Sequence, residues 1–265
     1  MKAFYILIAC SFCLTNAMDN SDSSEDMGHP TIVLDVDLIA DENVEATTPS
    51  WGQLRKQVSV LGCRNVCSLI KNYEQIREHG QELAKTVCGA TNVAKQLFQE
   101  RNYNFNQEQI ESLVALDIQP ALREGVPSFL RALKDLNFPI LAATNHDPHH
   151  YLQYAGYLAE KHNIKVQDYF AGAVVIKGPF EYDKSDIPYF ISEEPRPSYT
   201  YLSAILKQVA ENKSVLFFEA CETRVKKQQR LIKKDKDNNY GHVQVFHTQT
   251  IGEVRDQLKM LGYLE

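Results

Sequence analysis

The feature that most constrains the fold is a short apolar run that stops at a pair of aspartates. Thr31-Ile32-Val33-Leu34 is followed at once by Asp35-Val36-Asp37. A run of this length, rich in β-branched residues and without polar interruption, is typical of a parallel strand buried on both faces. Such a strand has to be flanked by parallel neighbours and covered by helices, so the chain should repeat a β-α pattern.

Later segments repeat that pattern. Four further runs have the same apolar character, the last of them more weakly: residues 138–143, 171–176, 214–218 and 242–246. Amphipathic stretches with helical periodicity lie between or after them, at residues 126–136, 150–162, 198–210, 222–233 and 251–261. Strands that alternate with helices of this length predict an α/β protein with a Rossmann-like, doubly wound parallel sheet.

Residues 48–118 break the alternation. They contain several helical patterns and no convincing strand, which predicts an all-helical insertion, the cap, in a core formed by residues 31–47 and 119–265. Because the insertion follows the first strand, it should overhang the carboxyl ends of the sheet strands. Ligands bind at that edge in open α/β sheets.

The amino terminus predicts export. Lys2 precedes an apolar run over residues 3–14, and small or polar residues then lead to Ala17, so we expect a signal peptide over residues 1–17. The run is shorter than the roughly 20 residues that one bilayer crossing needs, so no stable membrane anchor is expected. Residues 18–30 are polar and acidic, which is typical of a disordered leader. The mature protein should be secreted or periplasmic.

Charge and cysteine content limit the partners and leave one question open. A formal net charge of −6 argues against a broad nucleic-acid surface, because phosphate binding needs clustered Lys and Arg.

Export would place Cys63, Cys67, Cys88 and Cys221 in an oxidising compartment. A disulfide among the first three and buried free thiols remain equally open.

Asp35 and Asp37 are the candidate reactive groups. They lie two residues apart at the end of the first strand, on the same side and at the ligand-binding edge. Two carboxylates so placed repel each other unless a cation lies between them or one is protonated. The pair therefore suits a divalent metal, and the alternative is that both are capping or loop aspartates.

Several segments, in order, resemble motifs of the haloacid-dehalogenase (HAD) superfamily. Ile32-Val33-Leu34-Asp35-Val36-Asp37-Leu38-Ile39 is similar to the first motif, a strand ending Asp-x-Asp-x-Thr. Gly125-Val126-Pro127 resembles the start of the helix before the second motif, and Ile140-Leu141-Ala142-Ala143-Thr144-Asn145 resembles that motif itself. Asp168-Tyr169-Phe170 resembles the next helix-to-strand junction. The resemblance covers residues 31–262 and implies a HAD core with a helical cap.

The resemblance implies a role for each matching residue. Asp35 would attack phosphorus to form an aspartyl-phosphate, and Asp37 would act as general acid and base. Thr144, Asn145 and the amides around them would hold the phosphoryl oxygens. Mg²⁺ would be bound by Asp35, by the main-chain carbonyl of Asp37 and by Glu219. The implied protein is a magnesium-dependent phosphatase that acts on a small phosphorylated molecule.

The third and fourth motifs depart from the family pattern. The third motif supplies a lysine where this chain has Arg196, which keeps the charge but has a larger, planar head group. Lys177, after the third predicted strand, is the alternative cation for binding the substrate. The fourth motif pairs two acids, whereas here Glu219 is followed by Ala220. One carboxylate fewer should weaken metal binding.

These departures leave more than one function open. The first is the exported magnesium-dependent phosphatase. The second is a catalytically silent HAD-fold protein that binds a ligand or a protein partner, which is suggested by Ile39, Arg196 and Ala220. Dehalogenation by the same aspartate is a weaker third alternative, because dehalogenases of this superfamily do not need Asp37 as an acid.

Overall fold

The computed structural model describes residues 29–41, 57–116, 120–182, 185–209, 213–237 and 239–265. The predicted signal peptide and almost all of the predicted leader lie outside these residues. Within them, no helix combines the length and the apolar character that crossing a membrane requires.

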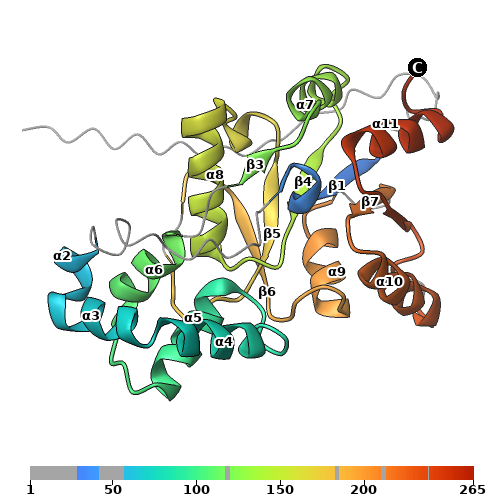
Figure 1. Cartoon of the computed structure of the whole chain (residues 1–265). Coiled ribbons are helices and arrows are strands. Elements are labelled where there is room, and N and C mark those ends of the chain that lie inside the picture. Colours follow the sequence, from blue (N-terminus) through green and yellow to red (C-terminus); the bar gives the residue numbers. More distant parts are fainter. Residues whose placement is uncertain (1–28, 42–56, 117–119, 183–184, 210–212, 238) are drawn as a thin grey trace, which may run out of the picture.

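A six-stranded sheet forms the centre of the core (Figure 1), in the order β6-β5-β4-β1-β7-β8. The strands are β1 (Thr31–Asp35), β4 (Ile140–Ala143), β5 (Gly172–Ile176), β6 (Tyr189–Ser192), β7 (Val215–Glu219) and β8 (Val243–His247). Every pair of neighbouring strands in this sheet is parallel. The prediction of a doubly wound parallel sheet is confirmed.

β1 lies where the strand order reverses. From β1 the chain adds β4, β5 and β6 on one side and then returns to add β7 and β8 on the other. In the ladder, Asp35 is level with Ala143 of β4, and Leu34 is level with Phe218 of β7. The carboxyl ends of β1 and β7 therefore adjoin at the switch point, which is the place where open α/β sheets bind ligands.

Helices cover both faces of the sheet (Figure 1). They are α7 (Val126–Asp135), α8 (Pro148–His162), α9 (Tyr199–Leu206), α10 (Glu222–Lys234) and α11 (Ile251–Met260). Alternate residues of a strand point to opposite faces, so Ile32 and Leu34 pack with α7, α8 and α11, whereas Val33 packs with α9 and α10. All three side chains are fully buried, which explains the uninterrupted apolar run in the sequence.

The cap is a helical unit with a small core of its own. Its helices are α2 (Val58–Leu61), α3 (Cys63–Lys71), α4 (Tyr73–Leu83), α5 (Ala90–Glu100) and α6 (Gln107–Ala115). The buried residues that they share are Leu61, Val66, Leu69, Phe98 and Ile110. Asn106 and Gln109 form a capping box at the start of α6. Described residues 57–116 contain no strand.

A short antiparallel ladder, which the sequence does not predict, joins the cap to the core. β2 (Ala40–Asp41) pairs with β3 (Ala121–Leu122). The chain enters the cap after β2 and leaves it before β3, so the ladder holds the two crossings together. Two 3-10 helices complete the core: η1 (Val36–Leu38), directly after β1, and η2 (Val166–Asp168), before β5.

The cap docks on the amino-terminal end of α8 through Asp147. This side chain is fully buried, and its Oδ1 accepts a hydrogen bond of 3.2 Å from the main-chain N–H of His150 in α8. Its Oδ2 accepts a second, also of 3.2 Å, from the N–H of Thr91 in α5. The side chains of Asn92 and Lys95 in α5 donate to core carbonyls nearby. One carboxylate therefore caps a helix of the core and a helix of the cap.

Replacing Asp147 with alanine is expected to lower the free energy of unfolding by about 1 to 3 kcal/mol, because two helix N-termini lose their acceptor. Denaturant titration followed by circular dichroism would measure the loss. Asp168→Ala is the matched control, since Asp168 is exposed, and we expect it to change stability by no more than about 0.5 kcal/mol. Equal effects of the two substitutions would contradict the capping role.

The described cysteines are all free thiols. Cys63, Cys67 and Cys88 are exposed on the cap, and Cys221 is half-buried directly before α10. In this part of the chain the structure thus shows neither a disulfide nor burial of the three cap thiols.

Candidate active site

Five segments meet at the switch point of the sheet. Asp35 ends β1 and Glu219 ends β7. Asp37 lies in η1, which begins where the Oδ1 atom of Asp35 accepts a hydrogen bond from the main-chain N–H of Asp37. Arg196 comes from the loop before α9, and Arg224 from the first turn of α10. Three acids and two guanidinium groups are thereby gathered at one edge.

Arg196 joins the ends of the two neighbouring strands. Its Nη2 atom lies 3.1 Å from Oδ1 of Asp35, and its Nη1 atom lies 2.8 Å from Oε2 of Glu219. The side-chain oxygen of Asn145 accepts from the main-chain N–H of Arg196 at 2.9 Å and from its Nε at 3.4 Å. Only 2% of the Arg196 side chain is exposed. Asn145 therefore orients a buried guanidinium, which forms one bond to each of two carboxylates.

Arg224 contacts all three candidate metal ligands. Its Nε lies 2.8 Å from Oε1 of Glu219. Its Nη2 lies 3.2 Å from Oδ2 of Asp35 and 3.3 Å from Oδ2 of Asp37. The sequence patterns assign no role to Arg224. The sequence signal that could have indicated its role is a cation in the first turn of the helix that follows β7, close to Ala220, which stands where the fourth motif has its second acid.

Every acceptor position of the Asp35 carboxylate is used. Oδ1 accepts from Nη2 of Arg196 and, at 3.4 Å, from the N–H of Asp37. Oδ2 accepts from Nη2 of Arg224 and, at 3.3 Å, from the N–H of Ala220. A carboxylate offers about four lone-pair sites, and the side chain is 0% exposed. The predicted nucleophile is thus saturated and closed to solvent.

The charges in this cluster are coupled. Burial raises the pKa of Asp35, but the positive charges of Arg196 and Arg224 outweigh it and hold this pKa well below its usual range. Burial and the negative charge of Asp35 raise the pKa of Glu219 to about 8 against the pull of the two arginines. Burial and Asp35 also raise the pKa of Asp37. With Glu219 protonated, two guanidinium charges balance two carboxylates.

No family model and no curated protein matches this chain. Among solved structures it is similar to the HAD-hydrolase YfnB from Bacillus subtilis bound to magnesium, with 14% identity, 87% of this chain and 98% of that chain covered, and a TM-score of 0.48. It is also similar to the HAD family enzyme BT-2542 from Bacteroides thetaiotaomicron, with 11% identity, 88% of this chain and 98% of that chain covered, and a TM-score of 0.48. A third similar structure is CbbY from Rhodobacter sphaeroides in complex with phosphate, with 13% identity, 84% of this chain and 89% of that chain covered, and a TM-score of 0.45.

YfnB and BT-2542 are both named as HAD proteins. All three TM-scores lie below 0.5 and all three identities below 25%, so these similarities assign neither a family nor an activity to this chain. The chemistry of this chain therefore rests on its own residues.

The remaining predicted substrate ligands are engaged inside the protein or turned away from the cluster. The Tyr201 hydroxyl contacts the main-chain N and O of Thr144 at 2.8 and 2.9 Å. The Thr144 hydroxyl accepts from the N–H of His146 at 3.0 Å. The Lys177 side chain is 62% exposed and pairs with Glu193 at 2.9 Å. Of the four predicted substrate ligands, Asn145 and Arg196 contact each other in the cluster, whereas Lys177 makes no described contact there.

The residues present do not fit Mg²⁺. This ion requires about six oxygen ligands at about 2.0–2.1 Å and near-ideal geometry. Both Asp35 oxygens and both Glu219 oxygens already accept hydrogen bonds from guanidinium groups. Among the described residues, no group of three or more His, Cys, Asp or Glu side chains could hold a metal. The side chain of Arg224 supplies the positive charge that the sequence patterns ascribe to a metal.

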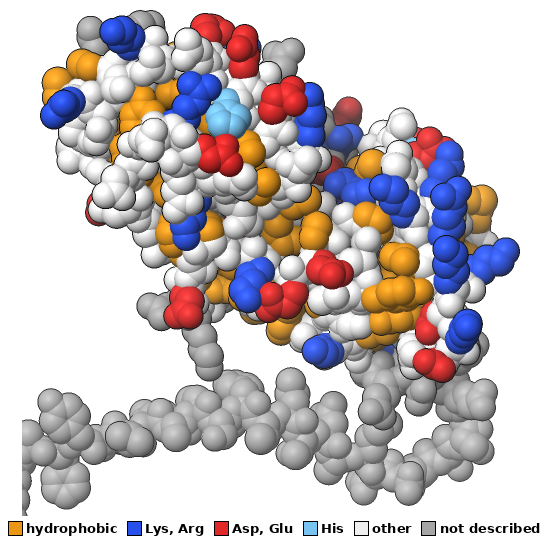
Figure 2. All heavy atoms as spheres, turned by 90° about the horizontal axis from the view of Figure 1, so that it is seen from below, with side chains coloured by type: hydrophobic (Ala, Val, Ile, Leu, Met, Phe, Trp, Pro, Cys, Tyr) orange, Lys and Arg blue, Asp and Glu red, His pale blue; other side chains and the backbone are white. Residues whose placement is uncertain are grey.

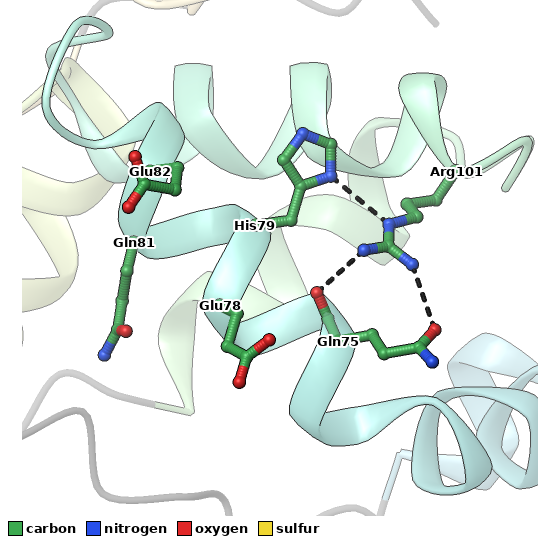
Figure 3. Close-up of a pocket in the computed structure, with 6 residues that line it drawn as sticks. All are labelled: Gln75, Glu78, His79, Gln81, Glu82 and Arg101. Atoms are coloured by element: carbon green, nitrogen blue, oxygen red, sulfur yellow. Dashed lines mark hydrogen bonds between the residues drawn. The ribbon is translucent and has the colours of Figure 1, made fainter.

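The cap has a separate polar hollow of about 430 Å³ (Figure 3). It is lined by Gln75, Glu78, His79, Gln81, Glu82 and Arg101. Arg101 donates to Nδ1 of His79 at 3.2 Å and to the main-chain oxygen of Gln75 at 2.8 Å. Because its one arginine is bonded within the cap, this hollow offers a weaker site for an anion than the cluster around Asp35.

Proposed function

We propose that this chain is a HAD-fold binding protein in which the aspartate cluster is structural and does not carry out magnesium-dependent phosphoryl transfer. The observation that carries the proposal is the position of Arg224, whose guanidinium contacts the side-chain carboxylate of each of the three residues expected to bind the metal. A metal ion cannot take this position unless the Arg224 side chain, which already places a positive charge there, moves away.

The state of Asp35 supports the same function. A carboxylate nucleophile needs an oxygen that can approach phosphorus, with a neighbouring group to stabilise the developing charge. Both oxygens of Asp35 accept two hydrogen bonds, and the side chain is fully buried. Attack would require breaking at least one of these bonds in a site that excludes water. The arrangement instead resembles a charge network that stabilises the switch point.

A second candidate keeps hydrolysis of a small phosphorylated molecule but without a metal. It is favoured by the exposure of one side of the cluster, where 42% of the Asp37 side chain and 23% of the Arg224 side chain are accessible. The raised pKa of Asp37 suits a general acid. If the side chain of Arg224 swung outward, the guanidinium groups of Arg196 and Arg224 could bind a phosphate and so replace the metal cation.

In both cases export belongs to the proposal. The apolar run over residues 3–14 and the small residues up to Ala17 support a secreted or periplasmic protein. Its ligand or protein partner would then be met outside the cytoplasm.

Calorimetry and a phosphatase assay separate the candidates. For the chain from Met18 onward, we expect no heat of Mg²⁺ binding and no hydrolysis of para-nitrophenyl phosphate. Hydrolysis that persists in EDTA and disappears in Asp35→Asn would favour the metal-independent hydrolase. Mg²⁺-dependent hydrolysis that disappears in Asp35→Asn would overturn both, because the cluster would then assemble a metal site.

A paired variant tests the role of Arg224 directly. Arg224→Ala combined with Ala220→Asp removes the tethered cation and restores the second acid of the fourth motif. We expect Mg²⁺ binding to appear in this variant, and Arg131→Ala, on the exposed side of α7, serves as the control. Equal Mg²⁺ binding by the unaltered chain and the variant would contradict the view that Arg224 replaces the metal.

A further inference from the structure

Helix α10 carries a dense row of cations on its outer face. Exposed basic side chains occur at Lys226, Lys227, Arg230, Lys233 and Lys234. Figure 2 shows basic side chains gathered in a column on the right of the view, the side on which α10 lies in Figure 1. The chain as a whole has a formal net charge of −6, so this row is a local reversal of the average charge.

The spacing of these residues places them in one row. At about 100° per residue, positions 226, 227, 230, 233 and 234 fall within an arc of about 120°, and they extend over about 12 Å of helix. Like charges this close repel one another at a cost of a few tenths of a kcal/mol per pair. The row is therefore not the arrangement that helix stability alone would favour, although cations suit the last turn.

Little in the described structure neutralises the row. Lys226 pairs with Glu222 at 2.6 Å. In the described part of the chain, no carboxylate lies within ion-pair distance of Lys227, Arg230, Lys233 or Lys234. The opposite face of α10 is fixed to the core by Val225, which is buried. A rigid element thus holds four cations without ion-pair partners toward solvent.

The composition of the row indicates what it binds. Four of its five cations are lysines, and lysine is depleted at protein interfaces, which depend on aromatic, Met and Arg anchors. The row contains no apolar residue. A hydrated lysine ammonium acts as a point charge and does not require a partner of fixed geometry. We propose that this face of α10 binds reversibly to an anionic lipid surface, with the phosphate and carboxylate groups of the headgroups as its ligands.

An extended nucleic acid fits these observations less well. A row of about 12 Å could contact only a few phosphates of one duplex, whereas binding to an extended nucleic acid depends on many phosphate contacts. A lipid surface requires only a local patch, and each Lys or Arg near an anionic membrane contributes about 1 kcal/mol. The proposal does not depend on whether the cluster at Asp35 is catalytic.

Vesicle co-sedimentation tests the proposal. The chain from Met18 onward is suitable because it keeps every described residue and lacks the apolar run at residues 3–14, which would bind lipid by itself. We expect binding to phosphatidylcholine vesicles that contain phosphatidylglycerol, no binding to phosphatidylcholine alone, and release by salt. Lys227→Gln with Lys234→Gln should weaken binding on the order of thirtyfold.

The control keeps the same change in net charge. Lys165→Gln with Lys259→Gln removes two exposed cations from other elements, and circular dichroism would verify that both double variants are folded. We expect this control to bind as the unaltered chain does. Equal weakening by the two double variants, or no binding to anionic vesicles at low salt, would overturn the proposal. Tighter binding to double-stranded DNA through Lys227 and Lys234 would overturn it in favour of a nucleic-acid partner.

Discussion

Replacing Arg196 with methionine is expected to lower the free energy of unfolding by about 3 to 5 kcal/mol, the range typical for breaking a buried ion pair. The guanidinium is 2% exposed and bonded to Asp35 and Glu219, which are both fully buried. Without it, two buried carboxyl groups lose a hydrogen-bond donor, and Asp35 keeps only Arg224 as a counter-charge. Guanidinium chloride unfolding followed by circular dichroism would measure the effect.

Two further variants show whether the loss comes from the unpaired charge. Arg131→Met makes the same change at an exposed position and should alter stability by no more than about 0.5 kcal/mol. Adding Asp35→Asn and Glu219→Gln to Arg196→Met removes the stranded acids and should restore much of the lost stability, because a buried ion pair is replaceable by neutral groups. If Arg196→Met cost no more than Arg131→Met, the structural role assigned to the cluster would be wrong.

The sequence predicts the central strands well because their signal is burial on both faces. β1, β4, β5, β7 and β8 each lie within a predicted run, or one residue beyond its end. β6 has no such signal: it is the edge strand after β5, and Ile191 is 50% exposed. The ladder of β2 and β3 is also missed, because two residues in each strand are too few for a periodic pattern.

The candidate site was predictable only in part. Strand ends locate Asp35 and Glu219, since parallel strands place their carboxyl ends at one edge. The sequence does not predict the compensating positive charge, because Arg224 reaches the acids from a helix whose other face carries the lysine row. Periodicity gives the register of such a helix but not the direction of one long side chain at its first turn. For the same reason, the sequence does not reveal that the side chain of Lys177 extends to Glu193.

The pH dependence of stability is expected to report the proton on Glu219. Its pKa is raised from 4.5 to about 8 by burial and by the charge of Asp35. Below pH 4.5 the group is protonated in both the folded and the unfolded state, so its contribution to stability is fully present. As the pH rises toward 8, the unfolded state loses the proton first. The free energy of unfolding should therefore fall through this window by a few kcal/mol.

Comparison with Glu219→Gln isolates this effect. The amide cannot titrate, whereas Asp35, with its lowered pKa, loses its contribution only below pH 3.8 and does so in both proteins. The stability of the unaltered chain relative to Glu219→Gln should thus decline between pH 5 and pH 8, measured by urea unfolding at each pH. A difference that stays constant would mean that Glu219 is already ionised in the folded protein. The arginines would then outweigh burial, and the cluster would carry one unbalanced negative charge that a bound cation could neutralise.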